Sequence, residues 1–388
     1  MKKNKIYSPV ELDFDSGECR ETFESKLSYI CNQVRYIKNP YIGNKSKILK
    51  YIIRTIEEEG IKYNSVLDLF SGSGCLSLAM KLMGKRVVAN DLLASSYVYT
   101  HAFVENNAEE LSEDEKEYLL TNRSHQNAID SLKIYEDGEH EDLNKFTYYE
   151  LEFLMHYRAN AKFLFSGMKN TCNRYNPYKL SLAFACLQLY VMDRVFVGGR
   201  LYKGQIIARV DHRLDHQRNQ GNEMDFEKIC WYDFRIKDDK NKHQAFRKDA
   251  YNLLTMYPEK IKDCELAYID PPYGGEQSDY FKMYDFFNRY SSGEIVNNHF
   301  DIANEGWDRF IKSDSYKDNF IKLLKALHKI GIPTWVISYN NSSWADIETI
   351  KNILSNFKNN VKVYDLDYKY KYRDAEKSSG TEYLIISR

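Results

Sequence analysis

The sequence predicts an α/β fold, and two stretches carry that prediction. Residues 65–70 form a short apolar strand, residues 71–74 a tight glycine turn, and residues 86–91 a second strand that ends in Asp91. A helix between these strands makes the segment a βαβ unit. The second stretch is an apolar run, residues 267–269, followed by Asp270-Pro271-Pro272-Tyr273. Two prolines cannot continue a sheet ladder, so this strand must stop there.

Helices and strands alternate along the rest of the regular chain, which favours a sheet covered by helices. Glycines follow several of the expected helices, and glycine is the residue that helix C-termini favour. In chain order we expect helices at 21–35, after the loop 39–46 as far as Gly60, at 75–83, at 95–106, at 316–329 and after a cap at Ser343, and strands at 248–250, 333–339, 361–370 and 381–387.

The pattern changes near residue 107 and resumes only near Phe246. Acid-rich stretches with weak periodicity lie between these points, together with a strongly apolar segment at 180–197 that we expect to be buried. A chain of this length accommodates two domains, or one domain with a large insertion. We therefore predict one domain formed by residues 39–107 and 244–388, interrupted by an insertion of residues 108–243 and preceded by an N-terminal extension of residues 1–38.

Composition limits the partners of the protein. The net charge is −1, so positive charge for binding nucleic acid must be local. The seven cysteines are scattered and form no C-x-x-C pair, which favours a reducing cytosol over a disulfide framework or a zinc site. His212 and His216 have the spacing of metal ligands on a helix, but no third ligand accompanies them. No apolar run approaches the length of a membrane span, so we expect a cytoplasmic protein without membrane or metal.

The glycine turn is a candidate ligand site. Glycines let a ligand approach the main chain, and the amino end of the following helix favours negative charge. A phosphate-binding loop would continue with Lys-Ser or Lys-Thr, whereas here Cys75-Leu76-Ser77 follow, so a nucleoside ligand fits better. Asp91, at the end of the next strand, is placed to accept both ribose hydroxyls. The alternative is a simple turn followed by a solvated Asp91.

The prolines after residue 269 define a second candidate site. Asp270, the Pro271 carbonyl and the Tyr273 ring would be displayed together at a strand end, which suits a planar ring that carries an amino group. A strand followed by a plain proline turn is the alternative. Asp279–Asn288 lies just beyond and is rich in aromatic residues. It is either a lid or platform for the pocket or a helix whose phenylalanines face the core.

Together, these motifs resemble those of S-adenosylmethionine-dependent amino-methyltransferases of DNA. The pattern Phe70-x-Gly72-x-Gly74 precedes Asp270-Pro271-Pro272-Tyr273, and Tyr41-Ile42-Gly43-Asn44-Lys45 is similar to the opening motif of the Dam-type adenine-N6 methyltransferase family. The order of the motifs is similar to that of the group whose target-recognition domain lies between the cofactor and catalytic motifs. The resemblance covers residues 39–107 and 244–388, and it implies a Rossmann-like methyltransferase fold with an inserted target-recognition domain.

The resemblance also implies roles for individual residues. Asp270 and Pro271 would accept the two amino hydrogens of adenine, next to Pro272, while Tyr273 stacks on a base flipped out of the duplex. Lys45 would lie near the charged end of the cofactor, Asp91 at its ribose and Asp249 at its adenine. The implied S-adenosyl-L-methionine site comprises Tyr41, Gly43, Lys45, Asp68, Phe70, Gly72, Gly74, Asp91, Asp249 and Asp270.

A basic run within the insertion is the candidate contact with double-stranded DNA. Phosphate contacts position a protein on the duplex, and side chains in the groove read the bases. The alternative is a solvated basic face. The expected DNA-binding residues are Arg200, Lys203, Arg209, Arg213 and Arg218.

We therefore predict a site-specific DNA adenine-N6 methyltransferase. It would act either as an orphan or in a restriction–modification system with a cognate restriction endonuclease. An RNA base methyltransferase with the same pocket and a DNA-binding regulator on an inactive methylase scaffold are the two alternatives.

Overall fold

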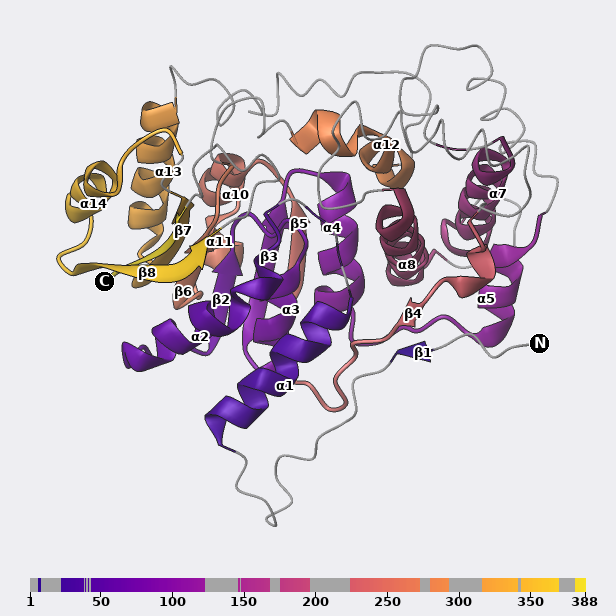
Figure 1. Ribbon diagram of the computed structural model, residues 1–388, viewed down its shortest axis with the longest axis horizontal. Coiled ribbons are helices and arrows are strands. Elements are labelled where there is room, and N and C mark those ends of the chain that lie inside the picture. Colours follow the sequence, from indigo (N-terminus) through magenta and orange to yellow (C-terminus); the bar gives the residue numbers. More distant parts are fainter. Residues whose placement is uncertain are drawn as a thin grey trace.

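A seven-stranded sheet runs through the centre of the protein (Figure 1). The computed structural model describes residues 6–7, 22–37, 39, 41, 43–122, 146, 148–167, 175–195, 224–272, 280–292, 316–340, 343–369 and 381–388. The strand order is β5-β3-β2-β6-β7-β9-β8. The strands are β2 (Ser65–Asp68), β3 (Arg86–Asp91), β5 (Gln244–Arg247), β6 (Leu266–Ile269), β7 (Thr334–Asn340), β8 (Val361–Lys369) and β9 (Thr381–Ser387).

The sheet is mixed but mostly parallel, which confirms the predicted fold class. Strands β5, β3, β2, β6 and β7 pair in parallel, whereas β9 runs antiparallel between β7 and β8. From β2 the chain builds the sheet outward in both directions, through β3 on one side and β6 on the other. Such a reversal of strand order opens a crevice at the carboxyl ends of the strands, where ligands of α/β sheets bind.

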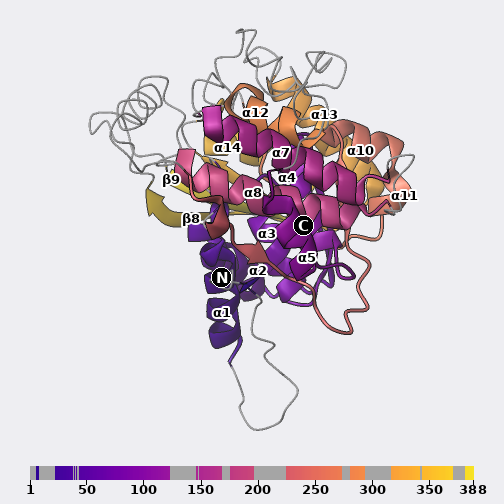
Figure 2. The ribbon, with the colours of Figure 1, turned by 90° about the vertical axis from the view of Figure 1, so that its right-hand side faces the viewer.

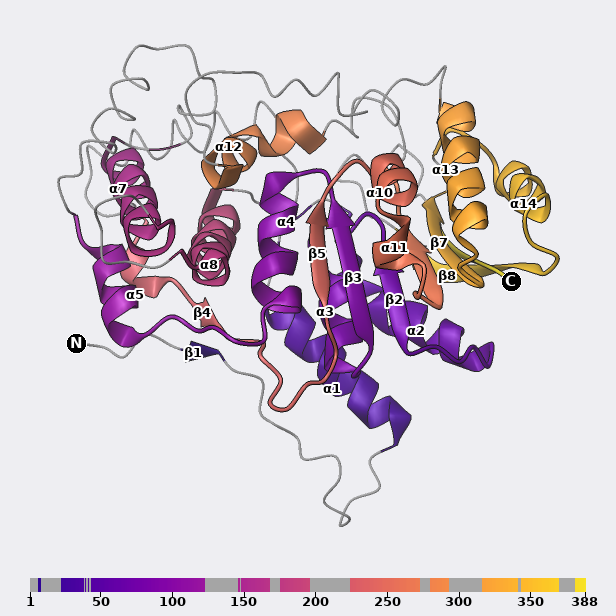
Figure 3. The ribbon, with the colours of Figure 1, turned by 180° about the vertical axis from the view of Figure 1, so that it is seen from behind.

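Helices cover both faces of the sheet, because its central strands are buried on both faces and need apolar cover. One side carries α1 (Phe23–Tyr36), the short 3₁₀ turn η1 (Lys45–Lys47), α2 (Leu49–Glu58) and α3 (Cys75–Leu82). The other side carries α10 (Ala250–Met256), α11 (Pro258–Ile261), α13 (Tyr316–Ile330) and α14 (Ile347–Ser355) (Figure 3). Each side has its own hydrophobic core.

The remaining helices lie beyond the β5 edge of the sheet, and Figure 2 views the molecule from this end. They are α4 (Ala94–Thr100) with the π-helical turn η2 (His101–Glu105), α5 (Glu113–Leu120), α7 (Tyr148–Phe165), α8 (Pro177–Val195), the turn η4 (Phe226–Lys228) and α12 (Tyr280–Ser292). Two short strands, β1 (Ile6–Tyr7) and β4 (Trp231–Tyr232), pair in parallel. None of the helices described here combines the length and the apolarity needed to cross a bilayer.

Helix α8 is tied to α4 and η2 by buried polar groups. Gln188 Nε2 donates to the Tyr99 hydroxyl (2.8 Å), and Ser181 Oγ lies 2.8 Å from His101 Nδ1. The buried apolar residues of α7 and α8 belong to the same core as those of α1, α2 and α3. The described parts of the insertion and of the N-terminal extension therefore share a core with the sheet, although they are separated in sequence.

A group of buried and half-buried charged residues lies where the chain returns to the sheet just before β5. Lys81 Nζ donates to the carbonyls of Phe103 (3.1 Å) and Asn106 (2.9 Å). Just before β5, His243 Nδ1 accepts from the Val87 amide (3.1 Å), and its Nε2 lies 2.7 Å from Asp239 Oδ2. Arg235 pairs with Asp233 and Glu110 nearby. We call Lys81, Asp233, Arg235, Asp239 and His243 the junction cluster.

Two expectations from the sequence are wrong in detail. The strand expected at 248–250 lies at Gln244–Arg247, and Asp249 instead caps α10 by accepting from the Asn252 amide (2.9 Å). The helix after Ser343 is capped by Asp346, whose carboxylate accepts from the Thr349 amide (2.7 Å). An aspartate at an N-cap competes well with serine, and its charge also suits the positive amino end of the helix.

Candidate active site

Three carboxylates meet at the carboxyl edge of the sheet. Asp68 ends β2, and in the sheet it lies opposite Ala89 of β3 and Tyr268 of β6. Asp91 and Asp270 each follow these partners by two residues, so the parallel register brings both to the same edge as Asp68. The predicted convergence of the glycine motif and the Asp-Pro-Pro motif is therefore present in the fold.

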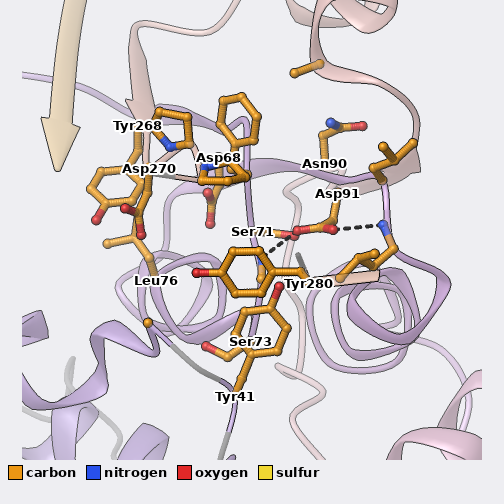
Figure 4. A pocket seen from close by; sticks show the side chains of 18 of the residues that line it. Tyr41, Asp68, Ser71, Ser73, Leu76, Asn90, Asp91, Tyr268, Asp270 and Tyr280 are labelled. Carbon is orange, nitrogen blue, oxygen red and sulfur yellow. Dashed lines mark hydrogen bonds between the residues drawn. The ribbon is translucent and has the colours of Figure 1, made fainter. Parts of the chain in front are cut away.

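A cavity opens between these strand ends (Figure 4). Its empty volume, including open solvent at its mouth, is about 1010 Å³. Figure 4 shows Asp68, Asp91 and Asp270 around the hollow, with the rings of Tyr41 and Tyr280 in front of it. Of the residues predicted from the sequence, those that line the cavity are Tyr41, Gly43, Lys45, Asp68, Phe70, Gly72, Asp91, Asp249, Asp270, Pro271 and Pro272.

Hydrogen bonds between backbone groups hold the glycine turn in place. The Ser71 amide donates to the Asn90 carbonyl (2.8 Å), and the Gly74 amide donates to the Ser71 carbonyl (2.7 Å). Gly72 has a φ of +50°, and a Cβ atom there would lie 3.0 Å from the Tyr41 ring. Both the conformation and the close approach require glycine at this position. Gly74, with a φ of +72°, caps α3 beside the cavity and is not among the residues that line it.

Asp91 closes the turn onto the next strand. Its Oδ2 accepts from the Gly72 amide (2.7 Å), and its Oδ1 accepts from the Leu93 amide (2.9 Å). Burial nevertheless raises the pKa of Asp91 to about 6, because these backbone hydrogen bonds offset only part of the desolvation. The carboxylate is thus fixed in orientation at the cavity wall.

Asp68 is the most strongly perturbed acid of the site. Burial raises its pKa to about 7, and the neighbouring Asp270 and Asp91 add to this rise, while the hydrogen bond from Ser77 Oγ (2.6 Å) opposes it. A carboxyl group desolvated in this way keeps its proton to higher pH. A bound cation at this wall would favour the ionised form.

Asn90 was not predicted from the sequence, but it organises the strand ends. Its Nδ2 donates to the carbonyls of Leu69 (3.2 Å) and Lys248 (3.0 Å), and its Oδ1 accepts from the Lys248 amide (3.2 Å). One side chain on β3 therefore holds the ends of β2 and β5. The sequence signal was slight, since Asn90 is a polar residue inside an apolar strand.

Lys45 lies between two carboxylates. It is 4% exposed, and its Nζ is 3.2 Å from Asp270 Oδ1 and 2.6 Å from Glu382 Oε1. The ammonium group therefore forms an ion pair with each of the two acids. Sequence reasoning placed Lys45 near the cofactor and did not select Glu382. The available signal for Glu382 was a single acid in the otherwise apolar strand 381–387.

Three tyrosines stack across the front of the site. The Tyr41 ring is parallel to Tyr284 (4.7 Å between ring centroids) and to Tyr280 (5.7 Å), and Tyr280 itself lines the cavity. Phe286 and Phe287, later in α12, are buried in the core. The two phenylalanines therefore face the core, as one of the two interpretations expected, while a role of the segment as lid or platform stays a prediction.

Some predicted residues lie outside the described part of the chain: Tyr273 and the five basic residues Arg200, Lys203, Arg209, Arg213 and Arg218. Their roles stay predictions. Within the described ranges, no group of three His, Cys, Asp or Glu side chains is arranged to hold a metal ion.

The sheet order and the acid-lined cavity at its reversal point define an α/β enzyme of the methyltransferase type. Residues 41–183 match the family model of the D12 class N6 adenine-specific DNA methyltransferases. This match confirms the resemblance to the Dam-type family and the predicted enzyme class.

Two curated relatives extend the similarity beyond that segment. The Type II methyltransferase M2.HphI of Haemophilus parahaemolyticus is 27% identical over 369 residues, which cover 92% of this chain and 98% of that protein. The modification methylase StsI of Streptococcus sanguinis is 23% identical over 363 residues, which cover 89% of this chain and 51% of that protein. Both matches span the predicted insertion as well as the flanking motifs.

Proposed function

We propose that the protein is a modification methylase that transfers the methyl group of S-adenosyl-L-methionine to N6 of an adenine flipped out of duplex DNA. One observation carries this proposal. Asp270 and Pro271 end their strand in the same cavity as the glycine turn, Asp68 and Asp91. A methyl donor held by the turn would therefore lie beside the acceptors of the amino group.

The cavity suits such a cofactor. Its wall is rich in carboxylates, and the methyl donor carries a positive charge. Ser71 Oγ is buried in this wall and has no hydrogen-bond partner among the described residues, which leaves it a donor for a ligand. We assign Asp91 to the ribose hydroxyls, Asp249 to the adenine edge, and Gly72 to a close backbone approach. When bound, S-adenosyl-L-methionine would supply a methyl group on a cationic sulfur, and the amino nitrogen that accepts this group would give up one of its two protons.

Asp270 and Pro271 activate the target base in this proposal. The exocyclic nitrogen of adenine is a weak nucleophile, because its lone pair is delocalised into the ring. The Asp270 carboxylate and the Pro271 carbonyl accept its two hydrogens, which turns the lone pair toward the methyl group. Lys45 Nζ lies 3.2 Å from Asp270 Oδ1 and pairs with this acceptor. Positioning supplies much of the rate, and Tyr273 stacks on the flipped base.

We assign DNA recognition to residues 108–243. Neutralising Arg200 and Arg213 together should weaken DNA binding and flatten its dependence on salt, since log affinity falls by about 0.9 per phosphate contact per decade of salt. Binding is measured by fluorescence anisotropy between low and moderate salt. Neutralising two surface lysines of α13, Lys322 and Lys325, is the control. An unchanged slope in the Arg200/Arg213 variant removes this segment from the interface.

The proposed setting is the bacterial cytoplasm, and the proposed partner is a cognate restriction endonuclease. Two relatives are named as a Type II methyltransferase and a modification methylase, which supports a role in protecting DNA from cleavage.

In the deciding experiment, the purified protein is incubated with labelled S-adenosyl-L-methionine and with either duplex DNA or total RNA. We expect label in DNA, at N6 of adenine within one short sequence. Transfer to RNA alone would make the protein an RNA base methyltransferase. Binding to DNA without transfer to either substrate would identify a regulator on the same scaffold.

A further inference from the structure

Glu382 is a buried acid in the last described strand that lies close to the proposed reaction centre. It is fully buried in β9, opposite Asn340 of β7. Its Oε1 accepts from Ser338 Oγ (2.7 Å) and lies 2.6 Å from Lys45 Nζ, and Asn340 Nδ2 is 3.5 Å from its Oε2. Burying an acid is costly unless it is paired and hydrogen-bonded, and Glu382 is both.

Lys45 connects this acid to Asp270. Its ammonium group is closer to Glu382 (2.6 Å) than to Asp270 (3.2 Å). Lys45 lies in the turn η1, Glu382 lies in β9, and Asp270 directly follows β6. The shorter contact therefore anchors the lysine to a rigid strand, and the longer contact presents it to the catalytic carboxylate.

Glu382 is not among the residues that line the described cavity. An acid behind the cavity wall has no direct access to a base or a methyl donor. Its influence on the reaction must therefore pass through Lys45, which does line the cavity.

We propose that Glu382 is a positioning residue that holds Lys45 at a fixed distance from Asp270. The proposal rests on the function proposed above. Without the charge of Glu382, the buried ammonium would move onto Asp270, the nearest remaining carboxylate. It would then compete with the adenine amino group for the same acceptor. Ser338 and Asn340 hold Glu382 in turn, so a rigid part of the sheet sets the geometry of the acceptor.

The first test is Glu382→Gln, which keeps the shape and hydrogen-bonding capacity of the side chain and removes its charge. We expect kcat for methyl transfer to fall about 10-fold or more, because small displacements at a reaction centre have effects of this size. The dissociation constant of S-adenosyl-L-methionine, measured by calorimetry, should change much less than kcat. A kcat equal to that of the wild type would overturn the proposal.

The second test is a double-mutant cycle with Lys45→Met. If Glu382 acts through Lys45, kcat of the double variant should be less than about twofold below kcat of Lys45→Met alone. If the two residues acted independently, the double variant should show the full loss of both single variants. The same cycle is read from melting temperatures, which need no turnover. The shift of the double variant should be smaller than the sum of the single shifts. Additive effects in both measurements would contradict the coupling.

Glu59→Gln is the matched control. Glu59 directly follows α2 and pairs with Lys362 (2.8 Å) and Arg388 (2.9 Å), and it is not among the residues that line the cavity. This substitution also removes an acid that is paired with cations, but it should leave kcat unchanged. If the wild type transfers no methyl group to DNA, the proposed function fails. The melting-temperature cycle then still decides whether Glu382 holds Lys45.

Discussion

The acids at the cavity and the acids of the junction cluster have pKa values shifted in opposite directions. At the cavity, burial raises the pKa of Asp68 to about 7 and that of Asp91 to about 6. In the junction cluster, burial also opposes ionisation of Asp233 and Asp239, but hydrogen bonds and charge from Arg235 and His243 outweigh it, and both pKa values are lowered.

The direction of the pKa shift distinguishes acids that serve the proposed ligand site from acids that stabilise the fold. The acids of the junction cluster have cationic or hydrogen-bonding partners within the chain, so their charges stabilise the fold. Asp68 and Asp91 lie in the cavity wall, where a cationic ligand would oppose the rise of their pKa values. Perturbed acids of this kind are typical of functional sites. The contrast therefore predicts which acids govern activity and which govern stability.

The largest expected effect is on catalysis at the cavity. Asp270→Ala should lower methyl transfer by about 1000-fold or more, since it removes an acceptor used in the reaction. Binding of S-adenosyl-L-methionine, measured by calorimetry, should be largely retained. Asp263→Ala, an exposed acid before the opposite end of the same strand, is the control. Near-normal turnover in Asp270→Ala would rule out the proposed mechanism.

A substitution at Asp68 should stabilise the protein without cofactor. The pKa of this acid is about 7 in the folded state and about 4 when unfolded, so its favourable contribution is complete below pH 4 and is lost as the pH rises to 7. At pH 8, the free energy of unfolding of Asp68→Asn should therefore exceed that of the wild type by up to about 4 kcal/mol. Urea denaturation at several pH values measures this gain, which should shrink steadily toward pH 4.

If the gain from Asp68→Asn does not depend on pH, the carboxyl group is not desolvated as described. The variant keeps an acceptor for Ser77 Oγ, so loss of that hydrogen bond would not explain a negative result.

The opposite sign is expected in the junction cluster. Asp239→Ala removes the partner of His243, a hydrogen bond to a charged group, and should lower the free energy of unfolding by about 2 kcal/mol. The folded pKa of Asp239 is lowered, so its contribution persists above pH 4 and is lost only as the pH falls below that value. Urea denaturation at pH 7 and pH 3 measures both effects. A stabilised Asp239→Ala variant would remove the contrast between the two groups.

The sequence predicted the sheet well where strands are central and apolar. The strands of residues 86–91 and 381–387 have the predicted bounds. Strand β5 was placed several residues late, because it is an edge strand of half-buried residues, Gln244–Arg247, and lacks a strong apolar signal. The position of β9 between β7 and β8 also escapes sequence reasoning, since strand order depends on contacts between distant segments.

The site was predicted where a local motif exists. The glycine turn and Asp270-Pro271-Pro272 are short patterns with a physical meaning, and the fold brings them to one cavity. Glu382 and Asn90 have no such pattern. Each acts through partners that are far away in the sequence, so only the fold reveals that Glu382 contacts Lys45 and that Asn90 holds Lys248.

The hydrogen bonds that join α8 to α4 and η2 limit how freely the segment around α8 can be exchanged. An insertion that folded by itself could be exchanged between relatives as an independent domain. Here Ser181 and Gln188 of α8 are bonded to His101 and Tyr99, next to the strand that carries Asp91. If residues 108–243 recognise DNA, as we propose, a graft of this segment from a relative must bring matching residues of α4 and η2 with it. Over evolution, α8 and the helices that it contacts are then expected to diversify together.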